Sequence, residues 1–172
     1  MQAETRTEVV NELPRMTFRP PRPEDATSMY ELARRSVPEC PGSRLSYVHS
    51  CRDFARTSVV ALRGESLVGF ALGYRKPGDP RCLVAWRTVA EDGRATEALK
   101  RAMLADMAER VRTHGVRRLE IPATLDDPSA AAIARLLAER YRARVEVSPL
   151  TDDDEPGFSG KPVVLHRFQL GD

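Results

Sequence analysis

Residues 82–89, CLVAWRTV, are a short run of apolar and strand-forming side chains, and the polar cluster 91–93, EDG, interrupts it. After Ala95 the pattern changes. Apolar side chains then recur at about every fourth position: Leu99, Met103, Leu104, Met107, Ala108 and Val111. Charges occupy most of the other face: Glu97, Lys100, Arg101, Asp106, Glu109 and Arg110. The spacing predicts an amphipathic helix, so residues 82–110 form a strand that turns directly into a long helix.

A helix that begins directly after a strand presents unpaired backbone N–H groups and the positive end of its dipole. Phosphate groups bind well at such helix ends. We therefore expect the turn before Leu99 to be a candidate anion site.

The composition limits the class of protein. The chain has 172 residues, 41% hydrophobic and 30% charged, which is typical of one globular domain. The net charge is +2 and the basic residues are spread along the chain, so we expect no nucleic-acid partner. Without an apolar run of membrane-spanning length or a signal-like apolar core, we expect no membrane association and a cytoplasmic protein. Three cysteines without a C-x-x-C pair, and widely spaced histidines, predict neither a disulfide framework nor a metal site.

The remaining patterns predict the order of elements. Residues 1–15 are polar and lack periodicity, so we expect a flexible leader followed by one domain over 16–172. Predicted strands are 16–19, 57–62, 67–74, 82–89, 119–123, 144–147 and 163–170. Predicted helices are 23–36, 45–54, 96–114 and 128–141, and residues 151–160 are expected to be an acidic loop. The resulting order, β-α-α-β-β-β-α-β-α-β-β, predicts an α/β or α+β layer built on one mixed sheet.

Two helices have apolar stripes that predict which faces are buried. In 45–54 the stripe is uneven and consists of Leu45, Val48, Cys51 (or Arg52) and Phe54. In 128–141 it is Ile133, Leu136, Leu137 and Tyr141.

The order of elements is similar to the GNAT acetyltransferase fold, a central mixed sheet flanked by helices. Several segments also resemble the diaminobutyrate acetyltransferases of ectoine biosynthesis. They are 18–25 (FRPPRPED), 51–61 (CRDFARTSVVA), 67–70 (LVGF), 73–75 (GYR), 79–80 (DP), Trp86 and the Leu99/Met103-Leu104 face. The resemblance runs from about Phe18 to about Ala138. It implies transfer of an acetyl group from acetyl-CoA to the 4-amino group of L-2,4-diaminobutyrate or a similar small amine, and by analogy a homodimer.

The same resemblance implies where acetyl-CoA binds. Backbone N–H groups at Thr88, Val89 and Ala90 would polarise the thioester carbonyl. The pyrophosphate would lie on the turn that contains Arg94, Ala95, Thr96 and Ala98. The family has glycines in this turn where the present chain has none, and Glu97 adds a carboxylate near the phosphates. A like-charge contact of this kind costs about 1 kcal/mol.

For the acceptor, the resemblance implies Trp86, Arg87 and Asp127 as substrate-binding residues. Arg87 and Asp127 stand where the family has Gln and Asn, and Trp86 could equally be a core or wall residue. Cys40 and Gly42 replace an Asp and an Asn of the family. These departures leave a second hypothesis open: a diverged relative that keeps the scaffold and acts as a binding or regulatory partner.

Two residues are candidates for removing the proton from the attacking amine. Glu120 could relay a proton through water, or it could be a solvated carboxylate at a strand end. His166 could act as a base, or it could be a solvent-facing histidine on a strand. The tyrosine that many GNAT enzymes use as a general acid would fall near Ala134.

Overall fold

The computed structural model describes residues 15–93, 95–150 and 161–171. Its elements are β1 (Met16–Arg19), the 3-10 turn η2 (Pro23–Asp25), α2 (Ala26–Ser36), α3 (Arg44–Asp53), the 3-10 turn η3 (Ala55–Thr57), β2 (Val59–Arg63), β3 (Ser66–Lys76), β4 (Asp79–Ala90), α4 (Thr96–Arg112), β5 (Arg118–Thr124), α5 (Pro128–Arg140), β6 (Glu146–Pro149) and β7 (Val163–Gln169). The predicted order of strands and helices is confirmed. The predicted acidic loop 151–160, and all of the predicted leader except Arg15, lie outside the described residues.

The strand order in the sheet is β1-β2-β3-β4-β5-β7-β6. β4 and β5 are parallel, whereas the β1–β2, β2–β3, β5–β7 and β6–β7 pairs are antiparallel. The sheet is therefore mixed, as the sequence predicts.

The chain folds as two compact units. Unit 1 takes its described residues from Met1–Leu72 and Arg87–Met107, and unit 2 takes them from Gly73–Trp86 and Ala108–Asp172. β3, β4 and α4 continue from one unit into the other. The single domain over 16–172 stays a prediction.

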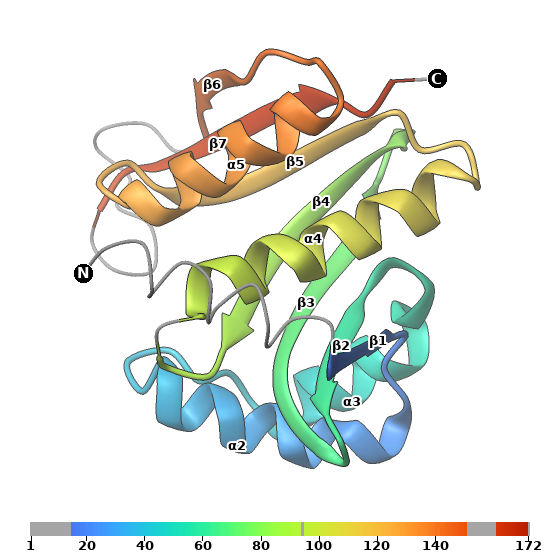
Figure 1. Cartoon of the computed structure of the whole chain (residues 1–172), viewed down its shortest axis with the longest axis vertical. Helices are drawn as coiled ribbons and strands as arrows, with labels where there is room; N and C mark the ends of the chain where they lie inside the picture. The colour runs from blue at the N-terminus through green and yellow to red at the C-terminus, as the bar shows by residue number, and fades with distance from the viewer. Residues whose placement is uncertain (1–14, 94, 151–160, 172) are drawn as a thin grey trace. The chain divides into compact units, whose positions relative to one another are not determined.

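The core of unit 1 lies between helices α2 and α3 and the strands of the same unit (Figure 1). Its buried side chains are Ala26, Met29, Leu32, Ala33, Tyr47, Cys51, Val60, Phe70, Leu72 and Val89. The α3 stripe predicted from spacing is wrong for three of its members, because Leu45, Val48 and Phe54 are exposed. Cys51 is buried as predicted, and Tyr47 and Ser50 face the core with it. A Tyr ring and a small thiol fill the space beside Phe70, and the ring hydroxyl of Tyr47 still finds a partner in Pro41 O at 2.6 Å.

α4 packs closely within unit 1, and its predicted stripe is confirmed. Leu99, Met103, Leu104 and Met107 are all buried there. A Cβ atom at Gly69 on β3 would lie 2.9 Å from the sulfur of Met103, so a larger residue at this position requires the end of the Met103 side chain to move.

In unit 2, α5 runs along β5 and β7 (Figure 1). The Asp127 carboxylate caps α5 by accepting hydrogen bonds from Ser129 N at 2.9 Å and Ala130 N at 3.0 Å. Ile133 and Leu137 are buried as predicted, but Leu136 is exposed, and Ala134 and Ala138 complete the buried face. Alanine side chains fill this face of α5 because the helix lies close to the strands.

Candidate active site

The first part of the site is the end of β4 and the turn into α4, both in unit 1. Thr88 is half-buried, and Val89 and Ala90 are buried. Glu91 N then donates to Val68 O at 2.9 Å, so the chain stays hydrogen-bonded to β3 for one residue beyond the end of β4. The Thr96 hydroxyl lies 2.9 Å from Glu91 O and 2.8 Å from Gly93 O, and shares its proton between them. Thr96 thereby closes the turn and begins the helix, so the predicted strand–turn–helix is confirmed.

The residues that stand in this turn in place of glycines adopt no backbone conformation that favours glycine. Ala95, Thr96, Glu97 and Ala98 have no positive φ; among the described residues other than glycine, Arg142 is the one position that has it. Because α4 begins at Thr96, Glu97 lies in its first helical turn, with its side chain exposed. There the carboxylate interacts with the same positive helix end that a phosphate would use. Arg94, the basic residue predicted for this turn, lies outside the described residues.

Arg87 forms the second part of the site in unit 1. Its Nη2 donates to Cys40 O at 2.5 Å, and its guanidinium carbon lies 6.0 Å from the centroid of the Tyr47 ring. Burial raises the pKa of Tyr47, and the Arg87 charge acts in the opposite sense. Arg87 therefore holds the loop between α2 and α3 against the end of β4.

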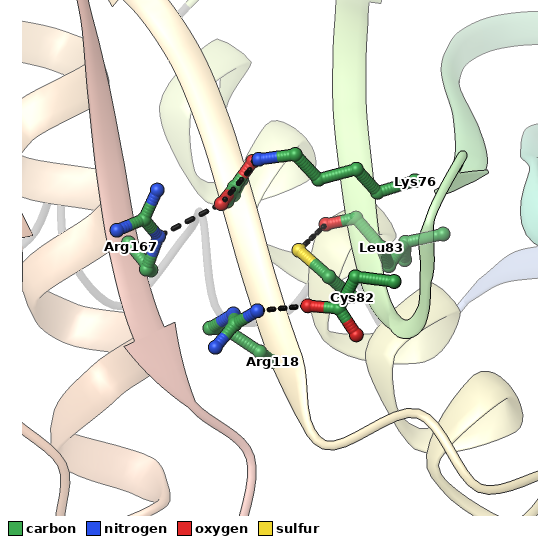
Figure 2. Close-up of polar contacts among 7 residues, drawn as sticks. Lys76, Cys82, Leu83, Arg118 and Arg167 are labelled. Atoms are coloured by element: carbon green, nitrogen blue, oxygen red, sulfur yellow. Dashed lines mark hydrogen bonds and ion pairs between the residues drawn. The ribbon is translucent and has the colours of Figure 1, made fainter. Parts of the chain in front are cut away.

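Glu120 on β5, in unit 2, is a buried carboxylate between two cations. Its residue exposure is 1%. Lys76 Nζ donates to both carboxylate oxygens, at 3.1 and 3.2 Å, and Arg167 Nε donates to one of them at 2.8 Å. Figure 2 shows Lys76 and Arg167 reaching from separate strands toward this carboxylate. Burial by itself would raise the pKa of Glu120, but the hydrogen bonds from Lys76 and Arg167 outweigh it and hold the pKa below its usual value. The expectation of a solvated strand-end carboxylate is wrong.

A second ion pair and a thiol lie beside this cluster. Arg118 on β5 pairs with Asp79 on β4, and the thiol of Cys82 lies 3.9 Å from Leu83 O (Figure 2). Burial raises the pKa of Cys82, so this thiol stays protonated at neutral pH. In the described part of the chain, no group of three or more His, Cys, Asp or Glu side chains is arranged to hold a metal ion.

His166 on β7 is buried, so the expectation of a solvent-facing histidine is also wrong. Burial lowers the pKa of its imidazole, and the charge of Asp127 partly opposes this shift. The ring is therefore neutral at pH 7 and has a nitrogen that can accept a proton. Asp127 uses one carboxylate oxygen, Oδ1, to cap α5.

The register of β5 and β7 separates the two proton-accepting candidates. His166 stands opposite Ile121, and Glu120 stands opposite Arg167. Since successive side chains of a strand point to opposite faces, Glu120 and His166 lie on opposite faces of this pair of strands. They therefore do not form one catalytic dyad.

The predicted site residues thus fall into two groups. Unit 1 contains Arg87, Thr88, Val89, Ala90, Ala95, Thr96 and Ala98, and unit 2 contains Trp86, Glu120, Asp127 and His166. Trp86 is 40% exposed, which leaves its ring accessible. Sequence reasoning missed Lys76, Arg167 and Tyr47, because a lysine, an arginine or a tyrosine on a strand or helix has no local pattern that indicates its partner. The functional roles of all these residues stay predictions.

The fold defined by these elements is that of the GNAT acetyltransferases. Diaminobutyrate acetyltransferase EctA from Paenibacillus lautus, solved with L-2,4-diaminobutyric acid and coenzyme A, superimposes with a TM-score of 0.73 at 22% identity, over 88% of this chain and 93% of that one. A GNAT phosphinothricin acetyltransferase from Sinorhizobium meliloti, solved with acetyl-CoA, gives 0.71 at 17% identity, over 91% and 89%. No described helix is long and apolar enough to cross a membrane.

Sequence comparison identifies the family within this class. No protein-family model matches the chain. The L-2,4-diaminobutyric acid acetyltransferase of Streptomyces coelicolor is 33% identical over 151 residues, which are 86% of this chain and 89% of the relative. The corresponding protein of Nocardia farcinica is 33% identical over 138 residues, 78% and 70% of the two chains. The chain belongs to the L-2,4-diaminobutyric acid acetyltransferase family, which confirms the resemblance.

Proposed function

We propose that this chain transfers an acetyl group from acetyl-CoA to the 4-amino group of L-2,4-diaminobutyrate. The observation that carries the proposal is the start of α4 soon after β4, with the Thr96 contacts, in a chain of this family. A helix that begins directly after the strand supplies the backbone donors that a pyrophosphate needs, whatever side chains the turn has.

On the donor side, the proposal assigns backbone roles. The N–H groups of Thr88, Val89 and Ala90 polarise the thioester carbonyl, and those of Ala95, Thr96 and Ala98 hold the phosphates, with Arg94 adding positive charge. The neutral amine attacks the thioester carbon, the C–N bond forms, and the C–S bond then breaks to release coenzyme A.

On the acceptor side, Trp86, Arg87 and Asp127 bind the amino acid. The amine loses one proton as the C–N bond forms, and the leaving sulfur gains one. His166 is the better proton acceptor of the two candidates because its pKa is lowered and its ring stays neutral at pH 7. The contacts of Glu120 with Lys76 and Arg167 make it a weak base, and they favour a role for Glu120 in holding the strands of unit 2 together.

A second candidate is a scaffold that binds a partner without catalysing transfer. Two observations favour it: the exposed Glu97 carboxylate in the first turn of α4, and the buried methyl of Ala134 where a general acid would be expected.

One experiment decides between the two candidates. Acetyl-CoA is titrated calorimetrically into the protein, and N-acetylated product is quantified by mass spectrometry, because the free cysteines would react with a thiol reagent. Saturable binding with product formation supports the enzyme. Saturable binding without product, or no heat at millimolar coenzyme, supports the scaffold.

We further propose that the protein is a cytoplasmic homodimer of single-domain chains, and that its product enters ectoine-type biosynthesis. The free thiols of Cys40, Cys51 and Cys82 are in accord with a reducing compartment. Light scattering coupled to gel filtration tests the dimer, and a monomer at micromolar concentration contradicts it.

A further inference from the structure

Several arginines of unit 1 have a carboxylate partner. Arg19 pairs with Asp25, Arg34 and Arg44 pair with Glu31, Arg52 pairs with Asp53, and Arg63 pairs with Glu91. For Arg87, by contrast, the described residues supply a backbone carbonyl and an aromatic face, and no carboxylate within ion-pair distance. Its Nε is buried without a hydrogen-bond partner. Among the residues that the structure describes, the half-buried guanidinium of Arg87 thus has no carboxylate counter-ion.

This arrangement is costly unless an anion completes it. A buried or half-buried charge is normally paired, and an unsatisfied donor loses its hydration without replacement. The fixed fork of a guanidinium matches the two oxygens of a carboxylate. The hydrogen bond to Cys40 O and the ring of Tyr47 restrict the orientation of the fork.

The place of Arg87 in the chain connects this cation with the proposed reaction. Arg87 directly precedes Thr88–Ala90, the segment whose N–H groups are proposed to hold the acetyl carbonyl. An acceptor bound to Arg87 through one end therefore has its other end near that segment. A short amino acid, with a carboxylate at one end and an amine at the other, fits this requirement.

We propose that Arg87 binds the carboxylate of the acceptor and so favours amines that carry a carboxylate over amines that do not. The inference rests on the proposed function, which it deepens by naming the feature of the acceptor that is recognised. Recognition at Arg87 requires the carboxylate and not the 2-amino group. The acceptor class therefore includes 4-aminobutyrate as well as L-2,4-diaminobutyrate, whereas 1,3-diaminopropane, which has both amines but no carboxylate, is a poorer acceptor.

A purely structural role for Arg87, holding the loop between α2 and α3, is the competing explanation. Loss of that role would lower kcat/KM for all acceptors to the same extent. Binding to the carboxylate would affect only acceptors that carry one. A comparison of acceptors in the same variant therefore separates the two explanations.

The test compares wild type with Arg87→Gln and Arg87→Lys. The matched control is Arg52→Gln, which changes an exposed arginine of α3. Each protein is assayed with L-2,4-diaminobutyrate, 4-aminobutyrate and 1,3-diaminopropane, and product is measured by mass spectrometry. For Arg87→Gln we expect kcat/KM to fall about 10- to 100-fold for the two carboxylates, chiefly through KM, with less than about twofold change for the diamine. Arg87→Lys keeps the positive charge but lacks the planar fork of the guanidinium. Its kcat/KM for the two carboxylates should therefore lie between the values of wild type and Arg87→Gln. Equal losses for all three acceptors, or no loss, overturn the proposal.

A binding measurement keeps this test separate from catalysis. L-2,4-diaminobutyrate is titrated into wild type and Arg87→Gln, each saturated with coenzyme A. A dissociation constant raised about 10- to 100-fold in the variant supports the carboxylate contact even where no product forms, and in that case only the proposed acetyl transfer fails. Equal affinity in the two proteins, or no binding to wild type, overturns the inference.

Discussion

Replacement of Glu120 by Gln should destabilise the protein, because it leaves the positive charges of Lys76 and Arg167 without their carboxylate partner. The Glu120 carboxylate accepts hydrogen bonds from Lys76 and Arg167 and is almost completely buried. An amide has one acceptor oxygen in place of two and no negative charge. Loss of one partner of a fully buried ion pair costs about 3–5 kcal/mol. The side chains of Lys76 and Arg167 are 39% and 30% exposed and regain some hydration. We therefore expect a smaller loss of unfolding free energy, about 2 kcal/mol.

Thermal unfolding followed by circular dichroism measures this loss. For a chain of this size, about 2 kcal/mol corresponds to a Tm lower by roughly 4–8 °C. Asp53→Asn is the matched control, since it removes an exposed carboxylate that pairs with Arg52 and His49, and it should lower the Tm much less than Glu120→Gln does. A Tm of Glu120→Gln within about 1 °C of wild type would refute the reasoning.

The pH dependence of the same variant gives an independent check. The folded pKa of Glu120 lies below its ordinary value of 4.5, so the unfolded chain takes up the proton first as the pH falls. The contribution of Glu120 is therefore fully present above about pH 5 and is lost as the pH falls through the folded pKa. The stability difference between wild type and variant should be constant from pH 6 to 8 and shrink in acid, and a difference that grows in acid contradicts this account.

Three other substitutions test the remaining parts of the site. His166→Ala should lower kcat by about 10²- to 10⁴-fold, and an unchanged kcat rules out His166 as the base. In wild type, the acid limb of the pH profile of kcat/KM should have its midpoint below the ordinary histidine pKa of 6.5. Glu97→Gln should tighten acetyl-CoA binding about fivefold at low salt, and calorimetry that finds weaker binding would contradict the placement of the phosphates. Asp127→Ala should lower the unfolding free energy by about 1 kcal/mol, because Ser129 N and Ala130 N lose their acceptor, and an unchanged Tm argues against the cap.

Local patterns predicted most of the elements but not always their buried faces. In α4, the apolar positions are so regular that only one face could be buried, and the structure agrees. In α3, the apolar positions are few, and Tyr47 and Cys51 are buried while Leu45 is 64% exposed. A short helix with a weak stripe is oriented by the shape of its neighbours, here the ring of Phe70, rather than by its own periodicity.

The sequence by itself determined the order of strands and helices, the strand–turn–helix at 82–110 and the family, because each of these depends on residues close together in the chain or on similarity along it. Only the tertiary structure decided which partners the candidate residues have. Glu120 meets Lys76, 44 residues away, and Arg167, 47 residues away, and Arg87 reaches Cys40 O across 47 residues. These contacts follow from the register of paired strands and the packing of a loop, and a shift of one residue in register would turn each side chain to the other face. The same physics decided that Glu120 is a buried, ion-paired carboxylate and that Arg87 has no carboxylate partner in the described part of the chain.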